Sequence, residues 1–513
     1  MFGRMTRRHG SASLLMIVVA IGVATLFPLS VSAQFGGGGG GGGGGLGGGG
    51  GGGLGGGGGG GGLGGGGGGG LGGGSGGGGG GTIGASPASG VVVDAEGVLR
   101  RRFFADPTGQ LAKQRIAEAR ARLNREVAAR SPLRKVSLNR LEAAIRNRIA
   151  AGEGPSDAMR YLAGMTRVRY VFYYPETHDI VIAGPAEVFG EDLSGRVVGL
   201  VSGQPTLVLE DLIVALRAFP PTGESTPAIF CSIDPTAEGL ARMQQFLRRV
   251  GSRATPRDTP VIVSGLQRSL GLQNITVGGV SPKTHFAQVL VEADYMMKLI
   301  GIGLQQPPIK LKSYVERANP ATVSRSALER WYFVPNYECV RVSDDALAMQ
   351  LEGDGVKLIS EAELVSRDGS RATSRRINRA SQAFVKEFTA KYDRLARKMP
   401  VFAQLRNLID VAVAAAFIQQ QDYYGQAGWN MEMFGSESRY PVEVYNAPKR
   451  VASAVNSLWK GRRLMTPIGG GVQIKPQQAI DGGYLLADED GQVAAARDAI
   501  DLKQLGPETW WWD

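Results

Sequence analysis

Histidine and cysteine are scarce in this chain, which holds three histidines and two cysteines among its 513 residues. His9 lies in the N-terminal segment, so His178 and His285 are left in the rest of the chain, and they do not form an H-E-x-x-H pair. Zinc sites need several such ligands brought together at suitable spacings. The sequence therefore predicts no metal site, and we expect no cofactor.

Common catalytic motifs are absent as well. The chain has no G-x-S-x-G elbow and no P-loop, which argues against α/β-hydrolases and P-loop NTPases. Ser457 and Lys460 match S-x-x-K, the spacing found in penicillin-recognising enzymes. Those enzymes also need S-D-N and K-T-G motifs later in the chain, and here the imperfect counterparts come before Ser457. The match therefore does not indicate that class of enzyme.

The two cysteines, Cys231 and Cys339, both lie in short apolar runs that predict buried strands. An even number of cysteines in an exported protein permits one disulfide bond between them. The alternative is two buried free thiols.

The N-terminal segment predicts export. The first eight residues carry three arginines and no acidic residue, and an apolar run follows from Leu14 to Leu29. Val31-Ser-Ala33 then fits the small-x-small cleavage rule, so we expect cleavage after Ala33. An uncleaved membrane anchor is the alternative.

No later run approaches the length of about 20 apolar residues that a membrane-spanning helix needs. We therefore expect no transmembrane segment after the signal is cleaved. The mature protein is expected to be periplasmic or associated with the cell envelope, or to be released outside the cell.

A glycine tract follows the predicted signal. Residues 36–81 contain 41 glycines, four leucines and one serine. Glycine loses the most backbone entropy on ordering and has no side chain to bury, so the tract predicts a disordered tether. Weak self-association through the four leucines is the alternative.

The charge of the chain is moderately basic, with a formal net charge of +11. Residues 111–150 carry eleven lysines and arginines against three glutamates, and their apolar residues recur at helical spacing on either side of Ser131-Pro132. This pattern predicts a basic helical pair whose charges form a solvated face. Because no aromatic residues interleave with the charges, we expect no specific nucleic-acid partner.

The rest of the chain alternates predicted strands and helices, which indicates an α+β or mixed α/β fold. A hairpin is predicted around residues 167–183, and a long helical segment interrupted by Pro400 is predicted over residues 375–423. In chain order we expect a signal peptide (1–33), a disordered Gly-rich linker (34–90), a basic helical region (91–155), a mixed α/β sheet domain (156–325), a strand meander with long helices (326–475) and a loop-rich tail (476–513).

One apolar stretch contains charges that need an explanation. In residues 285–304, Glu292, Asp294 and Lys298 stand among strongly apolar neighbours. Alternation predicts a strand from His285 to Ala293, followed by a short helix with Asp294 at its N-cap and Lys298 one turn later. In this interpretation the charges are structural. The alternative is a catalytic or ligand-binding cleft lined by Glu292, Asp294, Lys298 and His285.

Three phrases of the sequence carry a family resemblance. They are Ser232-Ile-Asp-Pro-Thr236, Ala293-Asp-Tyr-x-Met-Lys298 followed by Ile300-Gly-x-Gly303, and Met399-Pro-Val-Phe-x-x-Leu405. Together they resemble an uncharacterised family of exported proteins from planctomycete bacteria, defined as a domain of unknown function, over about residues 160–475. The resemblance implies an exported bacterial protein of mixed α/β type, and it implies no activity, substrate or catalytic residue.

The function expected from the sequence is a non-catalytic structural or interaction protein of the cell envelope, held or spaced by its glycine tether. Its partner would be another envelope component of unknown identity. The sequence does not define the oligomeric state of the chain. An extracytoplasmic hydrolase or ligand-binding enzyme with its site near Glu292–Lys298 is the first alternative. A basic binder of anionic polymer is the second.

Overall fold

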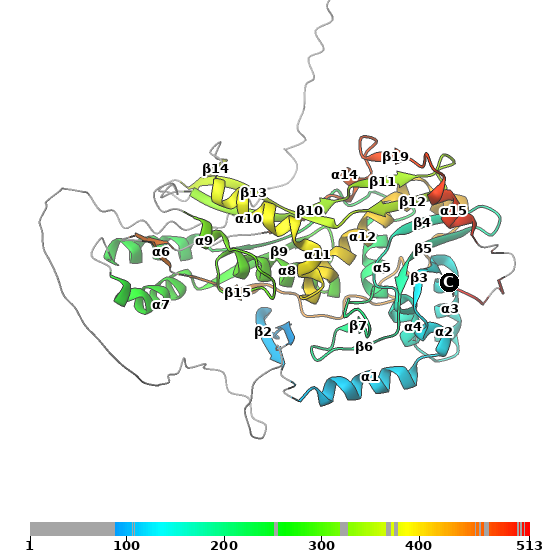
Figure 1. The fold of residues 1–513 in the computed structure, drawn as a ribbon, viewed down its shortest axis with the longest axis horizontal. Coiled ribbons are helices and arrows are strands. Elements are labelled where there is room, and N and C mark those ends of the chain that lie inside the picture. Colours follow the sequence, from blue (N-terminus) through cyan, green and yellow to red (C-terminus); the bar gives the residue numbers. More distant parts are fainter. Residues whose placement is uncertain are drawn as a thin grey trace, which may run out of the picture. The chain divides into compact units, whose positions relative to one another are not determined.

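The computed structural model describes residues 88–513, apart from short gaps at residues 105, 107, 251–254, 319–326, 366–370, 374–377, 457, 461–462, 466–470, 500–501, 503–504 and 507. The described residues form a mixed α+β fold built on two large sheets (Figure 1), which confirms the predicted fold class. The signal peptide and the glycine tract lie outside the described residues.

The larger sheet has nine strands, most of them antiparallel. Their order across the sheet is β1 (Ala88–Val93), β2 (Val98–Phe104), β15 (Arg450–Ala452), β9 (Leu272–Gly278), β8 (Ile229–Asp234), β18 (Gly471–Ile474), β10 (Ala327–Asn336), β13 (Gly355–Val365) and β14 (Arg371–Thr373). Neighbouring strands thus come from distant parts of the chain.

The smaller sheet has seven strands, in the order β19 (Leu485–Ala487), β11 (Cys339–Val342), β12 (Ala348–Glu352), β4 (Tyr170–Tyr174), β5 (Asp179–Ala186), β3 (Ser131–Ser137) and β20 (Trp511–Trp512). The hairpin of β4 and β5 pairs Phe172 with Val181, which confirms the predicted turn. Both sheets take strands from residues 156–325 and from residues 326–475, so a boundary near residue 325 does not separate one sheet from the other.

The remaining elements are mostly helices. They are α1 (Gln110–Arg122), α2 (Arg125–Ala128), α3 (Leu138–Ala150), α4 (Asp157–Arg160), the short 3-10 helices Leu162–Gly164 and Pro256–Asp258, α5 (Leu209–Ala218), α6 (Ala237–Val250), α7 (Thr259–Leu270), α8 (His285–Gly301), α9 (Tyr314–Arg317), α10 (Arg379–Ala390), α11 (Tyr392–Ala396), α12 (Pro400–Gln420), α13 (Tyr423–Ala427), α14 (Pro476–Ala479) and α15 (Gln492–Asp498). Two small hairpins complete the set: β6 (Phe189–Glu191) with β7 (Val197–Gly199), and β16 (Leu458–Lys460) with β17 (Arg463–Met465).

The basic N-terminal region contains the two predicted helices, α1 and α3. Ser137 caps α3 by accepting a hydrogen bond of 3.3 Å from the backbone N–H of Arg140. Strand β3 was not predicted from the sequence. It occupies the break at Ser131-Pro132 and pairs with β5 and β20. Proline is tolerated there because it stands near the start of the strand, where the register is irregular.

Helix α12 lies at the centre of the hydrophobic core and packs against α5 and α8. It begins at Pro400, as predicted, and its side chains from Val401 to Ile418 are all buried. Among the described residues this is the helix long and apolar enough to cross a membrane, and it is wholly enclosed by protein. Its hydrophobicity is therefore explained by its place in the core.

Cys231 lies in β8 of the nine-stranded sheet, where it is a free and buried thiol. The sequence left two alternatives for this residue, a disulfide bond to Cys339 and a buried free thiol. The backbone of Cys339 begins β11 in the seven-stranded sheet, and its side chain lies outside the described residues. Burial raises the pKa of the Cys231 thiol well above its usual value, so the thiol is protonated.

Candidate functional site

The stretch that contained the candidate charges is one continuous helix, α8, and not a strand followed by a helix. Thr284, rather than Asp294, is the N-cap and accepts a hydrogen bond of 3.2 Å from the backbone N–H of Ala287. Of its 17 residues, all but His285, Gln288 and Tyr295 are buried. A helix buried on almost every side has no clear polar face, which is why apolar alternation misled the prediction.

His285 and Glu292 are seven residues apart, so they lie on the same face of α8. His285 Nδ1 lies 2.8 Å from a carboxylate oxygen of Asp211 in α5. Glu292 forms an ion pair with Arg196, in the turn between β6 and β7, and Arg196 also donates a hydrogen bond of 2.7 Å to Gln404 of α12. These contacts join α8 to α5, to α12 and to the small hairpin.

Burial lowers the pKa of His285, but the charge and hydrogen bond of Asp211 outweigh that effect and hold the pKa above its usual value. The imidazole is thus stabilised in its protonated form beside a carboxylate.

Asp294 and Lys298 lie on the opposite face of α8, directed toward β8. Lys298 donates hydrogen bonds to Asp294, at 2.9 Å, and to the carbonyl oxygen of Ile233, at 3.3 Å. Burial raises the pKa of Asp294 to about 6 and lowers the pKa of Lys298. The predicted acid-before-base pair therefore exists, but it is enclosed between a helix and a sheet.

The four candidate residues do not converge. At 100° per residue, Asp294 and Lys298 lie roughly half a turn around the helix from His285 and Glu292, so the body of α8 separates the two pairs. None of the four lines a cavity described in this structure. Glu292 and His285 instead have ion-pair partners on neighbouring elements, whereas Asp294 and Lys298 pair with each other within α8.

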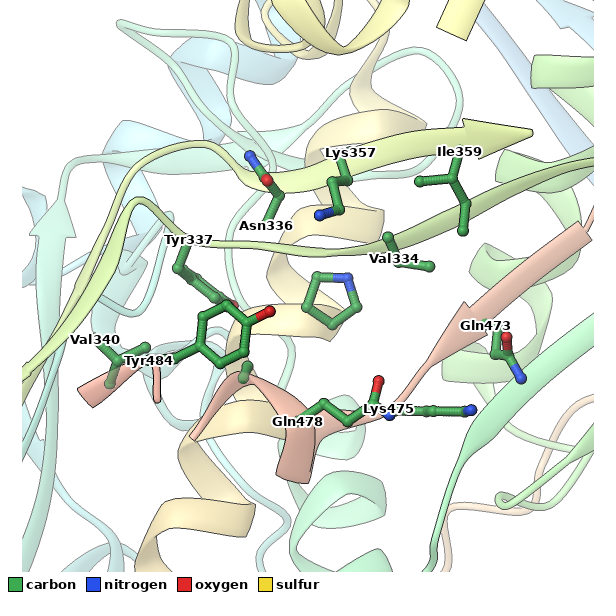
Figure 2. A pocket seen from close by; sticks show the side chains of 12 residues that line it. Val334, Asn336, Tyr337, Val340, Lys357, Ile359, Gln473, Lys475, Gln478 and Tyr484 are labelled. Carbon is green, nitrogen blue, oxygen red and sulfur yellow. The ribbon is translucent and has the colours of Figure 1, made fainter. Parts of the chain in front are cut away.

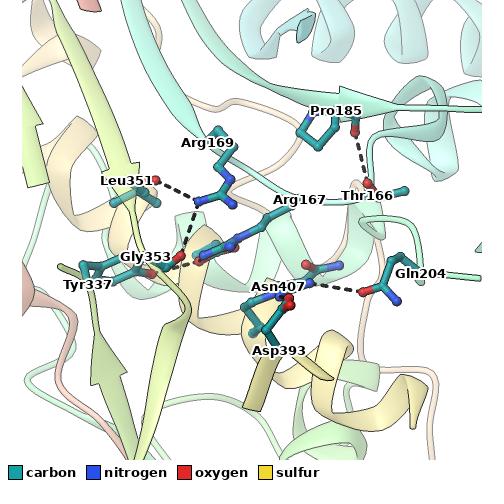
Figure 3. A network of polar contacts seen from close by, with 12 residues as sticks. Thr166, Arg167, Arg169, Pro185, Gln204, Tyr337, Leu351, Gly353, Asp393 and Asn407 are labelled. Atoms are coloured by element: carbon teal, nitrogen blue, oxygen red, sulfur yellow. Dashed lines mark hydrogen bonds and ion pairs between the residues drawn. The ribbon is translucent and has the colours of Figure 1, made fainter. Parts of the chain in front are cut away.

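A second buried charge network was missed by the sequence analysis (Figure 3). Arg167, just before β4, donates a hydrogen bond of 2.7 Å to Asp410 of α12, and the Tyr337 hydroxyl donates one of 3.0 Å to the same carboxylate. Arg169 donates to the carbonyl oxygens of Leu351 and Gly353. Asp410 is a lone acid in an apolar helical run, which is the signal that could have indicated a buried partner.

Burial raises the pKa of Tyr337 well above its usual value, and the negative charge of Asp410 raises it further. The Tyr337 hydroxyl therefore stays protonated and acts as a hydrogen-bond donor. Its hydrogen bond fixes the side chain at the point where the chain passes from β10 in one sheet to β11 in the other.

Tyr337 also lines a pocket of about 320 Å³ at this crossing (Figure 2). Lys357 of β13 pairs with Val334 of β10. On the other side of β10, Val472 of β18 pairs with Phe333, so the next residue, Gln473, follows beside Val334. The side chains of Lys357, Val334 and Gln473 share one face of the nine-stranded sheet. The full lining consists of Val334, Pro335, Asn336, Tyr337, Val340, Lys357, Ile359, Gln473, Lys475, Gln478, Ala479 and Tyr484.

The polar groups of this pocket differ from those of α8 because they are not paired. Within the described part of the chain, no hydrogen-bond or ion-pair partner contacts the side chains of Asn336, Lys357, Gln473, Lys475, Gln478 or Tyr484. Two of these residues are lysines, and no carboxylate lines the pocket. Figure 2 shows Lys357 and Tyr484 directed toward the middle of the group from opposite sides.

The sequence analysis missed this pocket because its residues come from four separated segments. The motif phrases lie elsewhere, and only the three-dimensional pairing of β10, β13 and β18 brings Lys357 and Lys475 to the lining of one pocket. The described residues also hold no group of three or more His, Cys, Asp or Glu suited to a metal ion.

Comparison with known proteins gives one match. Residues 231–314 match a family described as "Protein of unknown function (DUF1598)". This range runs from β8 to the start of α9 and includes α8 with its paired charges. No curated protein and no solved structure matches the chain. The resemblance to a domain of unknown function is therefore confirmed for this range, and it carries no activity with it.

Proposed function

We propose that this chain is an exported, non-catalytic interaction protein of the cell envelope, spaced from its surroundings by the glycine tract. One contrast carries the proposal. The charged residues of α8 are each paired with a structural partner, whereas unpaired polar groups gather around an accessible pocket at the crossing of the two sheets. Paired charges hold structure, and unpaired donors and acceptors around a cavity are suited to recognise a ligand.

Three features of the N-terminal segment support export. They are the basic first residues, the apolar run from Leu14 to Leu29 and the small residues before the cleavage site at Ala33. We expect cell fractionation to recover the protein with the envelope or periplasm, and its intact mass to begin at Gln34. Ala33→Tyr should leave a longer polypeptide, because a bulky residue is excluded at that position of the cleavage site. Recovery of the uncleaved protein in the cytoplasm would contradict the proposal.

The alternative of a hydrolase near Glu292–Lys298 has one observation in its favour. The pKa of Asp294 is raised to about 6, and perturbed carboxylates are common at catalytic sites. Against it, Asp294 is fully buried beneath β8. An assay of product release from envelope polymers by the purified protein distinguishes a hydrolase from a binding protein. Turnover by the native protein that disappears in Asp294→Asn would favour the hydrolase, and no turnover by either would favour a binding protein.

A further inference from the structure

The charge of the pocket selects the sign of its ligand. Lys357 and Lys475 line a single cavity of about 320 Å³, and no acidic side chain lines it with them. Lys357 and Lys475 are partly buried. Two lysines with no carboxylate among the lining residues make the electrostatic potential of the pocket positive. The pocket is therefore suited to a negatively charged group.

The remaining lining selects more than charge. Asn336, Gln473 and Gln478 present carboxamides, each of which both donates and accepts hydrogen bonds. A simple inorganic anion accepts hydrogen bonds and would leave the carboxamide oxygens unused. Hydroxyl groups both donate and accept, so they can use the whole set.

The floor and one wall of the pocket are apolar or aromatic. Val334 and Ile359 lie on the sheet face, and the Tyr484 side chain is 60% exposed at the rim. Tyr337 is held in place from below by its hydrogen bond to Asp410. Flat rings of this kind offer a surface for the C–H face of a ligand ring while their hydroxyls remain available for hydrogen bonding.

From these three properties we infer that the pocket binds an acidic sugar, the unit of an anionic polysaccharide. The ammonium groups of Lys357 and Lys475 bind its carboxylate, the carboxamides bind its hydroxyls, and Tyr484 covers one face of its ring. The inference rests on the proposed function, which makes the cell envelope the source of the ligand. It adds the chemical class of the envelope component that the chain binds.

The test is calorimetric titration of the full mature chain with glucuronate, with glucose as the neutral counterpart and inorganic phosphate as the plain anion. We expect glucuronate to bind more tightly than either. Lys357→Ala and Lys475→Ala should each weaken glucuronate binding by about tenfold or more, because each removes a hydrogen bond to a charged group. Tyr484→Ala should weaken glucuronate binding and leave any phosphate binding unchanged.

The matched control is Lys386→Ala, which removes the same charge from an exposed position on α10. It should bind glucuronate like the native chain. Lys357→Gln, which keeps most of the side-chain stem, serves beside Lys357→Ala so that a folding defect is not taken for a binding defect, and thermal unfolding is compared for every variant.

Three results would overturn the inference: no binding of glucuronate, equal weakening in Lys386→Ala, or phosphate binding as tight as glucuronate binding and insensitive to Tyr484→Ala. The first leaves the pocket without this ligand, the second indicates general charge attraction, and the third indicates a plain anion site. A cytoplasmic location with intact glucuronate binding would remove the proposed function and leave the inference standing.

Discussion

Lys298 donates a hydrogen bond of 2.9 Å to Asp294, one turn earlier in α8, and both side chains are buried against β8. This pair explains two of the charges in an otherwise apolar helix. A buried pair contributes little net stability when both partners are present, because their attraction offsets the loss of hydration. Removal of one partner has a much larger effect, since it leaves an uncompensated charge in the core.

We therefore expect Asp294→Ala to lower the free energy of unfolding by about 3–5 kcal/mol. An N-cap role would have predicted a loss of about 0.5–2 kcal/mol. Denaturant midpoints of the two proteins measure the difference. The double variant Asp294→Ala/Lys298→Met, which removes both charges and keeps the size of the longer side chain, should regain most of the lost stability. A double variant no more stable than Asp294→Ala would contradict this account.

His285 should make stability depend on pH in a defined direction. Its pKa is raised by Asp211 above the ordinary value of about 6.5, with Arg196 opposing and Glu210 assisting the shift. A raised histidine pKa stabilises the folded state fully below about pH 6.5, and this contribution is lost as the pH rises through the raised pKa.

His285→Gln should remove that contribution. The difference in unfolding free energy between the native chain and His285→Gln should therefore be largest in mild acid and shrink as the pH rises past neutrality. The imidazole titration followed by NMR gives the folded pKa directly. A difference that grows with rising pH would show that Asp211 does not stabilise the imidazolium.

Two tyrosines of the pocket should respond differently to loss of the hydroxyl group. Tyr337→Phe removes a hydrogen bond to the buried carboxylate of Asp410 and should cost about 1.5–3 kcal/mol. Tyr484→Phe removes a hydroxyl that has no partner among the described residues, so its unfolding midpoint should match the native one. Equal effects of the two changes would mean that Tyr337 is not anchored by Asp410.

The sequence predicted elements well where local signals are strong. The hairpin of β4 and β5 forms within the predicted residues 167–183, and α12 begins at Pro400 as the proline indicated. The strand prediction over His285–Ala293 was wrong because tertiary burial, and not an amphipathic pattern, decides the state of α8. Local periodicity carries no information about a helix that is enclosed on all sides.

The pocket was beyond prediction for a different reason. Lys357 and Lys475 are far apart in the chain, and neither belongs to a recognisable motif. They line one pocket because β13 and β18 both flank β10, a pairing that no local pattern encodes. Likewise, Asp410 could be recognised as an unusual acid in an apolar helix, but its partners Arg167 and Tyr337 could not be named without the fold.

The glycine tract, which lies outside the described residues, should be dispensable for folding. Its four leucines would gain at most about 2–3 kcal/mol each by burial. Ordering the tract would cost about 1 kcal/mol or more for each of its residues, which exceeds that gain several-fold. Deletion of residues 35–85 should therefore leave the melting temperature of the mature chain unchanged in calorimetry.

A deletion at the other end provides the contrast for that experiment. Removal of residues 510–513 eliminates β20 and takes away Asp513, which pairs at 2.7 Å with the fully buried Arg134. The guanidinium would lose its carboxylate partner, and the packing of Trp512 against Phe172 and Val181 would be lost with it. This four-residue deletion should lower the melting temperature clearly, although it is far shorter than the tract. If the tract deletion lowered it as much, the glycine residues would have to pack on the folded part, and their role as a tether would be wrong.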